Sequence, residues 1–210
     1  MERENLLHKV RTALGRSAGQ PADPVPPVHL RIPDVPMETR IARLLERVEA
    51  LAGNTQRAHS PEDAYAYVSS LVHAKTAIAS NALFLRACGI TDLPNVRSGI
   101  MDRAELRDLA ARVDFGITCA DYALADTGTL VILSSPQEAR LISLLPPAHI
   151  AVVPGERVLT GLDELLSILP LPAEQTSSMV FITGPSRTAD IEQFLVRGVH
   201  GPGTVHVVVV

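Results

Sequence analysis

The sequence predicts an α/β fold in which a largely parallel sheet carries helices on both faces. Short runs rich in Val, Ile and Leu alternate with amphipathic stretches along most of the chain. Strands of this continuous apolar character are typical of parallel sheets that are buried on both faces. With 210 residues, of which 46% are hydrophobic, the chain is long enough to bury the core of one substantial domain.

The first 36 residues are expected to form a short helix followed by an extended arm. Apolar residues recur at helical spacing from Leu6 to Leu14, and Gly15 can end that helix. Six prolines lie between Gln20 and Pro36, where they remove backbone donors and favour extended conformations. A helix this short is not stable alone in water, so we expect it to dock on its own domain, on a partner or on a second copy.

Two amphipathic helices open the single α/β domain expected over residues 37–210. The first spans residues 41–51, and the second starts at the N-cap Ser60, has Pro61 at its first position and runs to about His73. Beyond this point strands are expected over residues 76–80, 115–119, 128–133, 150–153, 179–183 and 204–210, and helices over residues 83–88, 102–112, 162–169 and 188–197.

Composition argues against several classes of protein. The chain has 19 Lys and Arg against 23 Asp and Glu, and its aromatic content is 3%, whereas nucleic-acid binding needs a basic surface and often stacking rings. No apolar run approaches the roughly 18 residues of a spanning helix, and the charged N-terminus is unlike a signal peptide, so a cytoplasmic location is expected. Cys88 and Cys119 form no CxxC pair, and no metal site is expected.

The densest polar pattern follows the strand expected over residues 179–183. A Gly-Pro turn leads into the helix expected over residues 188–197, and open parallel sheets bind ligands at the carboxyl ends of their strands. Free amides at the helix start, together with Arg187, suit a carboxylate or a phosphate, although helix capping explains every residue here except Arg187. The candidate ligand-binding residues are Gly184, Pro185, Ser186, Arg187, Thr188 and Asp190, and Glu192 is a candidate for proton transfer.

Two further segments combine glycine with polar side chains. The first leads into the strand expected over residues 128–133, where small residues allow a ligand to approach the backbone and Asp126 can orient or deprotonate it; the same residues also make a good turn. The second is the glycine-rich link 197–203, in which His200 can titrate near neutrality or be a solvated loop residue. The candidates are Asp126 and His200 for proton transfer, and Thr127, Gly128, Thr129 and Gly201 for ligand binding.

Four segments, in this order and with this spacing, resemble the LUD-domain family: ALADTGTLVIL, RLISLLPPAHIAVV, GPSRTADIE and RGVHGPG. The resemblance implies a Rossmann-like domain similar to the superfamily of sugar-phosphate isomerases, CoA-transferases and formyltetrahydrofolate cyclo-ligases. It also implies a bacterial operon in which two iron-sulfur proteins act with this subunit to oxidise L-lactate to pyruvate. Iron-sulfur clusters are then expected on those partners, and no cofactor is expected on this chain.

Three functional hypotheses follow. In the first, the chain is a subunit of a lactate-oxidising complex and holds a small anionic ligand between residues 127–129, here called the TGT turn, and the helix start near Arg187. In the second, it is a non-catalytic assembly or ligand-sensing subunit that recruits the iron-sulfur proteins through its N-terminal helix and arm. In the third, it is a free-standing enzyme acting on a sugar phosphate or a CoA ester. No G-x-G-x-x-G fingerprint follows an expected strand, so a nicotinamide or flavin is not supported.

Overall fold

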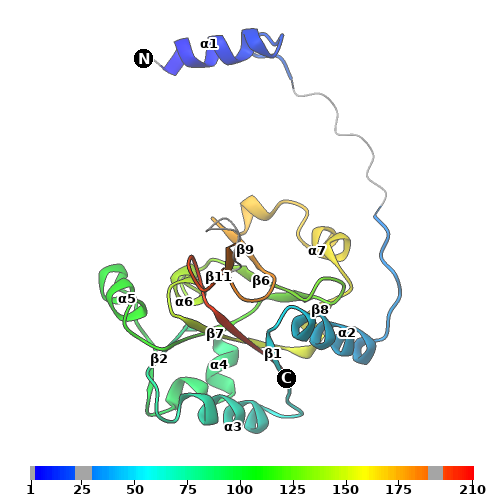
Figure 1. The fold of residues 1–210 in the computed structure, drawn as a ribbon. Helices are drawn as coiled ribbons and strands as arrows, with labels where there is room; N and C mark the ends of the chain where they lie inside the picture. The colour runs from blue at the N-terminus through cyan, green and yellow to red at the C-terminus, as the bar shows by residue number, and fades with distance from the viewer. Residues whose placement is uncertain (1–2, 22–29, 189–195) are drawn as a thin grey trace.

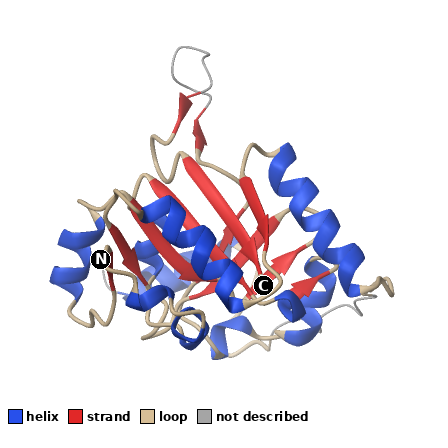
Figure 2. Cartoon of the chain, turned by 90° about the horizontal axis from the view of Figure 1, so that it is seen from below, coloured by secondary structure: helices blue, strands red, loops and turns tan. Residues whose placement is uncertain are grey.

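A parallel sheet of six strands forms the centre of the domain (Figures 1 and 2). The structure, a computed structural model, describes residues 3–21, 30–188 and 196–210. All neighbouring strands of the sheet are parallel, which confirms the α/β prediction. In spatial order the strands are β1 (Asn54–Arg57), β12 (Thr204–Val209), β7 (Ala148–Val153), β4 (Phe115–Cys119), β2 (Ala77–Ala79) and β3 (Val96–Arg97).

A second, smaller sheet packs on one face of the first. It contains, in order, β8 (Val158–Leu159), β5 (Tyr122–Leu124), β6 (Thr129–Leu133) and β9 (Met179–Ile182). β6 is antiparallel to both β5 and β9. The strands expected over residues 128–133 and 179–183 therefore exist, but their expected place in the parallel sheet is wrong. The reason is the tight turn between β5 and β6, because a short hairpin connection joins only antiparallel strands.

Helices cover both faces of the parallel sheet. The helices of the described ranges are α1 (Arg3–Ala13), α2 (Met37–Ala50), α3 (Pro61–Val72), α4 (Leu83–Ala87), α5 (Arg103–Ala110), α6 (Arg140–Leu144) and α7 (Leu162–Ile168), with short 3-10 helices at Ile90–Asp92, Gly155–Arg157 and Pro172–Glu174. α3 and α4 pack on one face, and α5, α6, α2 and the second sheet pack on the other (Figure 1). α7 covers the outer face of the second sheet.

Local signals in the sequence set several helix boundaries. The Ser60 hydroxyl accepts a hydrogen bond from the Asp63 amide at 3.2 Å, and the Asp102 carboxylate caps α5 by accepting from two backbone amides. α1 buries none of its residues and stands apart from the domain in Figure 1. None of the helices in the described ranges is long and apolar enough to cross a membrane.

The helix expected over residues 188–197 is wrong at both of its ends. β10 (Arg187–Thr188) and β11 (Val196–Arg197) instead form an antiparallel pair in which Arg187 lies opposite Arg197. Figure 2 shows these two short strands projecting from the domain. A helix of this length would hold its ends about 14 Å apart at 1.5 Å per residue, which is incompatible with their pairing. Residues 189–195, the middle of the expected helix, lie outside the residues that the structure describes.

Candidate functional site

The TGT turn connects β5 to β6 and packs against α2. Gly128 has a φ of 70°, and its amide donates to the Leu124 carbonyl at 3.0 Å. A Cβ atom at this position would lie 2.9 Å from the Arg47 Cβ and 3.0 Å from the Val48 amide nitrogen. The turn interpretation of this segment is therefore confirmed, and the space beside Gly128 is filled by α2.

The threonine hydroxyls of the turn reach the end of β9. The Thr129 hydroxyl donates to Thr127 at 2.8 Å and lies 2.9 Å from the hydroxyl of Thr183. Leu124, Asp126, Leu162 and Phe181 complete, with these threonines, a hollow of about 280 Å³. The structure thus brings the TGT turn next to the residue that precedes Gly184, although the two lie in distant parts of the chain.

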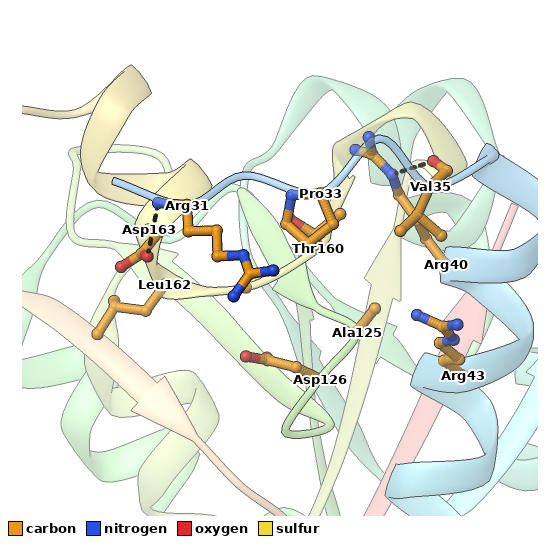
Figure 3. Close-up of a pocket in the computed structure, with 11 residues that line it drawn as sticks. Arg31, Pro33, Val35, Arg40, Arg43, Ala125, Asp126, Thr160, Leu162 and Asp163 are labelled. Carbon is orange, nitrogen blue, oxygen red and sulfur yellow. Dashed lines mark hydrogen bonds between the residues drawn. The ribbon is translucent and has the colours of Figure 1, made fainter. Parts of the chain in front are cut away.

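Asp126 faces a larger hollow on the other side of the turn. Its amide donates to the Thr160 carbonyl at 3.1 Å, and its carboxylate lies so close to Gly161 that a Cβ atom there would be 2.5 Å from Oδ2. The hollow has a volume of about 330 Å³ and is bounded by the arm, by α2 and by the start of α7 (Figure 3). We call it the arginine-lined hollow, after Arg31, Arg40 and Arg43.

Two of these three arginines are available to a ligand. Arg40 donates from Nε to the Val35 carbonyl at 2.7 Å and from Nη1 to the Glu164 carboxylate at 2.9 Å. Figure 3 shows the guanidinium groups of Arg31 and Arg43 reaching into the hollow from the arm and from α2, and Asp126 lines the same hollow. Within the described ranges neither forms an ion pair with a side chain. The hollow therefore presents two guanidinium groups, suited to a carboxylate or a phosphate.

Glu164 holds Arg40 as part of the wall. Burial disfavours the charged form of Glu164, but hydrogen bonds from the Thr160 amide and hydroxyl and from Arg40 outweigh it and hold the pKa of Glu164 below its usual value. The Arg31 amide also donates to the Asp163 carboxylate at 3.3 Å. These bonds fasten the arm and α2 to the start of α7.

Arg187 lies at a different place from the one expected. Its guanidinium donates to the carbonyl of Leu51, the residue that follows the last turn of α2, where a cation is favoured by the helix dipole. Gly184, with a φ of 80°, packs against Leu51 as well. The predicted anion cradle of helix-start amides plus Arg187 stays a prediction, since residues 189–195 lie outside the described ranges, but Arg187 itself bonds the end of α2.

The remaining residues that the sequence predicted for the site lie in different places. Ser186, whose amide donates to the Pro202 carbonyl at 2.8 Å, lines a hollow of about 220 Å³ with Gly184, His200 and Gly201. Pro185 is buried, and Thr188 belongs to β10. Asp190 and Glu192 lie outside the residues that the structure describes.

The sequence analysis missed the arginines of the hollow. Arg40 and Arg43 are one turn apart on the polar side of α2, which is a detectable but common pattern. Arg31 lies in the proline-rich arm, where no local pattern points to Asp126. Among the described residues no group of three or more His, Cys, Asp or Glu could hold a metal ion.

The sequence and the fold of this chain are both similar to those of known proteins. A family model described as the LUD domain matches residues 41–210. Lactate utilization protein C of Halalkalibacterium halodurans is 45% identical over 101 residues, covering 46% of this chain and 44% of that protein. The protein of that name from Exiguobacterium sp. is 42% identical over 108 residues, covering 50% and 47%. The chain thus spans about half the length of these two relatives.

Two further matches extend over more of the chain. Lactate utilization protein C 1 of Bacillus mycoides is 30% identical over 176 residues, covering 77% of this chain and 75% of that protein. A crystal structure of a DUF162 family protein from Deinococcus radiodurans superposes with a TM-score of 0.64, covering 83% of this chain and 98% of that one, at 18% identity. The structural match supports the fold alone.

Proposed function

This chain belongs to the LUD-domain family, and from that premise we propose that it serves in bacterial lactate utilization. More specifically, it acts as a subunit of a complex that oxidises L-lactate to pyruvate and binds a small carboxylate. Relatives named lactate utilization protein C support the role in lactate utilization. The observation that supports binding of a small carboxylate is the arginine-lined hollow beside the TGT turn.

The hollow supplies groups that match an α-hydroxy or α-keto acid. The guanidinium groups of Arg31 and Arg43 suit the carboxylate, since charge-assisted bonds from arginine are among the stronger hydrogen bonds in proteins. Asp126, which lines the same hollow, accepts a hydrogen bond from an α-hydroxyl group and can receive its proton. The proposed ligand thus lies on the Asp126 side of the TGT turn, away from Arg187.

Calorimetric titration with L-lactate and with pyruvate tests this proposal. Arg43→Ala should weaken binding about 10- to 100-fold, because a hydrogen bond to a charged group contributes about 1.5 to 3 kcal/mol. Arg86→Ala is the matched control, since Arg86 is an exposed arginine on α4, which packs on the opposite face of the parallel sheet. Unchanged binding in Arg43→Ala, or no binding by the unsubstituted protein, would refute the ligand assignment.

The exposed helix α1 favours a second candidate, an assembly role. Leu6, Val10 and Leu14 lie on or next to this helix and are 52%, 47% and 67% exposed. Such an apolar stripe fits docking on an iron-sulfur partner protein. Because Arg31, Pro33 and Val35 of the arm line the hollow, a clean test removes residues 1–21 only. Loss of co-purification with the two iron-sulfur proteins, with lactate binding retained, supports this role; full retention of the complex rejects it.

A further inference from the structure

The chain reverses direction across the parallel sheet between β2 and β4. From the carboxyl end of β2 it moves outward to β3, whereas from the carboxyl end of β4 it moves the other way to β7. In open α/β sheets a crevice forms outside the carboxyl ends of two strands with such diverging connections, and ligands bind there. The arginine-lined hollow lies elsewhere, beside the second sheet.

Glu138 lies at this point of divergence. Its Oε2 atom accepts from the hydroxyl of Ser80, the first residue after β2, at 2.7 Å, and from the amide of Cys119, the last residue of β4, at 3.2 Å. The residue is 5% exposed. One carboxylate oxygen therefore links the ends of the two strands that flank the crevice.

The other carboxylate oxygen of Glu138, Oε1, takes no part in these hydrogen bonds. Oε1 of Glu138 is buried and, within the described ranges, has no hydrogen-bond partner. The hydroxyl of Ser134 is likewise buried without a partner. Buried polar atoms without partners are rare because each costs about 1 to 3 kcal/mol. A purely structural role for Glu138 accounts for Oε2 but not for Oε1.

Both residues line the same hollow. It has a volume of about 500 Å³ and is bounded by the start of α5 and by residues 134–139. An adjoining hollow of about 540 Å³ shares Arg103, Leu106, Ser134, Ala139 and Ser177 with it. Arg103 is exposed and forms no ion pair within the described ranges. The lining of the hollow therefore combines an unpaired cation with two residues, Ser134 and Glu138, that each have a buried polar atom without a partner.

We propose that this hollow, which Glu138 connects to the ends of β2 and β4, is a second ligand site, in which Glu138 Oε1 and the Ser134 hydroxyl bind a carbonyl or hydroxyl oxygen of a small molecule whose carboxylate or phosphate contacts Arg103. The Glu138 carboxyl donates its proton in the hydrogen bond to that oxygen. This proposal does not depend on lactate being the ligand of the arginine-lined hollow.

The protonation of Glu138 at neutral pH agrees with such a donor role. Burial raises its pKa to about 8, against the lowering effect of the Ser80 and Cys119 hydrogen bonds, and the nearby Asp121 raises it further. The Cys119 thiol, whose pKa burial and Glu138 raise to about 12, stays neutral beside it. Arg103 at the rim is the cation on the α5 side of the hollow.

Titration with two probes tests the proposal and separates the two anion types. Pyruvate carries a carbonyl and a carboxylate, and dihydroxyacetone phosphate carries a carbonyl and a phosphate; inorganic phosphate serves as the anion-only control. We expect one of the two carbonyl probes to bind, with an affinity that falls about 10-fold between pH 7 and pH 9 as the Glu138 proton is lost.

Two variants of Glu138 give opposite expectations. Glu138→Gln keeps an oxygen for Ser80 and Cys119 and an amide donor for the ligand, so binding should persist without its pH dependence above pH 7. Glu138→Leu should abolish binding, and Glu105→Gln, on the exposed side of α5, should change neither property. The proposal is overturned if neither carbonyl probe binds, or if Glu138→Gln leaves the pH profile of binding unchanged. It is also overturned if Arg43→Ala abolishes the binding signal, because the probe would then be bound in the arginine-lined hollow.

Discussion

Gly128→Ala should destabilise the protein by about 3 kcal/mol. Alanine in the left-handed conformation of Gly128, at a φ of 70°, costs about 1 to 2 kcal/mol. Its Cβ would also lie 2.9 to 3.0 Å from the Cβ and carbonyl carbon of Arg47 and the amide of Val48. Because these are mostly backbone atoms of α2, relief requires moving the helix, and overpacking of this kind costs about 1 to 3 kcal/mol.

Urea unfolding measures this loss directly. With a slope of about 2 kcal/mol per molar, the midpoint should fall by about 1.5 M while the slope stays unchanged. Gly99→Ala is the matched control, since Gly99 has a φ of 77° and no heavy atom within 4 Å of the added Cβ, so it carries the conformational cost alone. Equal destabilisation by the two variants would refute the packing of the TGT turn on α2. Displacement of α2 should also weaken ligand binding, because Arg43 lies on that helix.

Three further perturbations have defined outcomes. The pKa of Glu138 is raised to about 8, so its contribution to the free energy of unfolding is present below the ordinary carboxyl pKa and is lost as the pH rises toward 8. Urea unfolding at pH 5 and pH 8 should detect this loss, and Glu138→Gln should remove it. Burial lowers the pKa of His149 to about 3, and its ring lies 2.8 Å from the Thr118 hydroxyl. Nitrogen NMR spectra at pH 5 should therefore show a neutral ring, and a protonated ring would contradict the lowered pKa. Gly116→Ala places a Cβ 1.8 Å from the Ile142 carbonyl oxygen and should prevent folding at 37 °C, as judged by circular dichroism.

Local patterns were enough to predict most elements of the parallel sheet. The apolar run over residues 150–153 lies within β7, the N-cap Ser60 begins a helix that the structure contains, and the helix expected over residues 102–112 corresponds to α5. Assignment of a strand to a sheet is a different problem, because β6 is as apolar as a strand of a parallel sheet. Its antiparallel pairing depends on the hairpin turn and on contacts with β9, which residue type alone does not encode.

The candidate site was predictable only in part. The TGT turn has a local signature, and the structure places it beside Thr183 at the end of β9. Arg31 lines the same hollow as Asp126 only because the arm packs against the start of α7. Glu138 belongs to no motif, since its significance comes from β2 and β4 lying side by side. Contacts between segments distant in sequence are set by tertiary packing, so spacing along the chain does not predict them.

The position of β12 has a consequence for the biosynthesis of the chain. This last strand lies between β1 and β7, and it is the partner through which β1 joins the sheet. Translation proceeds from the N-terminus, so β1 leaves the ribosome long before its neighbour exists. The sheet can close only after residues 204–209 have emerged, and the late, long-range pairing makes folding slow relative to that of proteins with mainly local contacts. Until then the exposed edges of β1 and β7 are the surfaces that a chaperone would need to protect from aggregation.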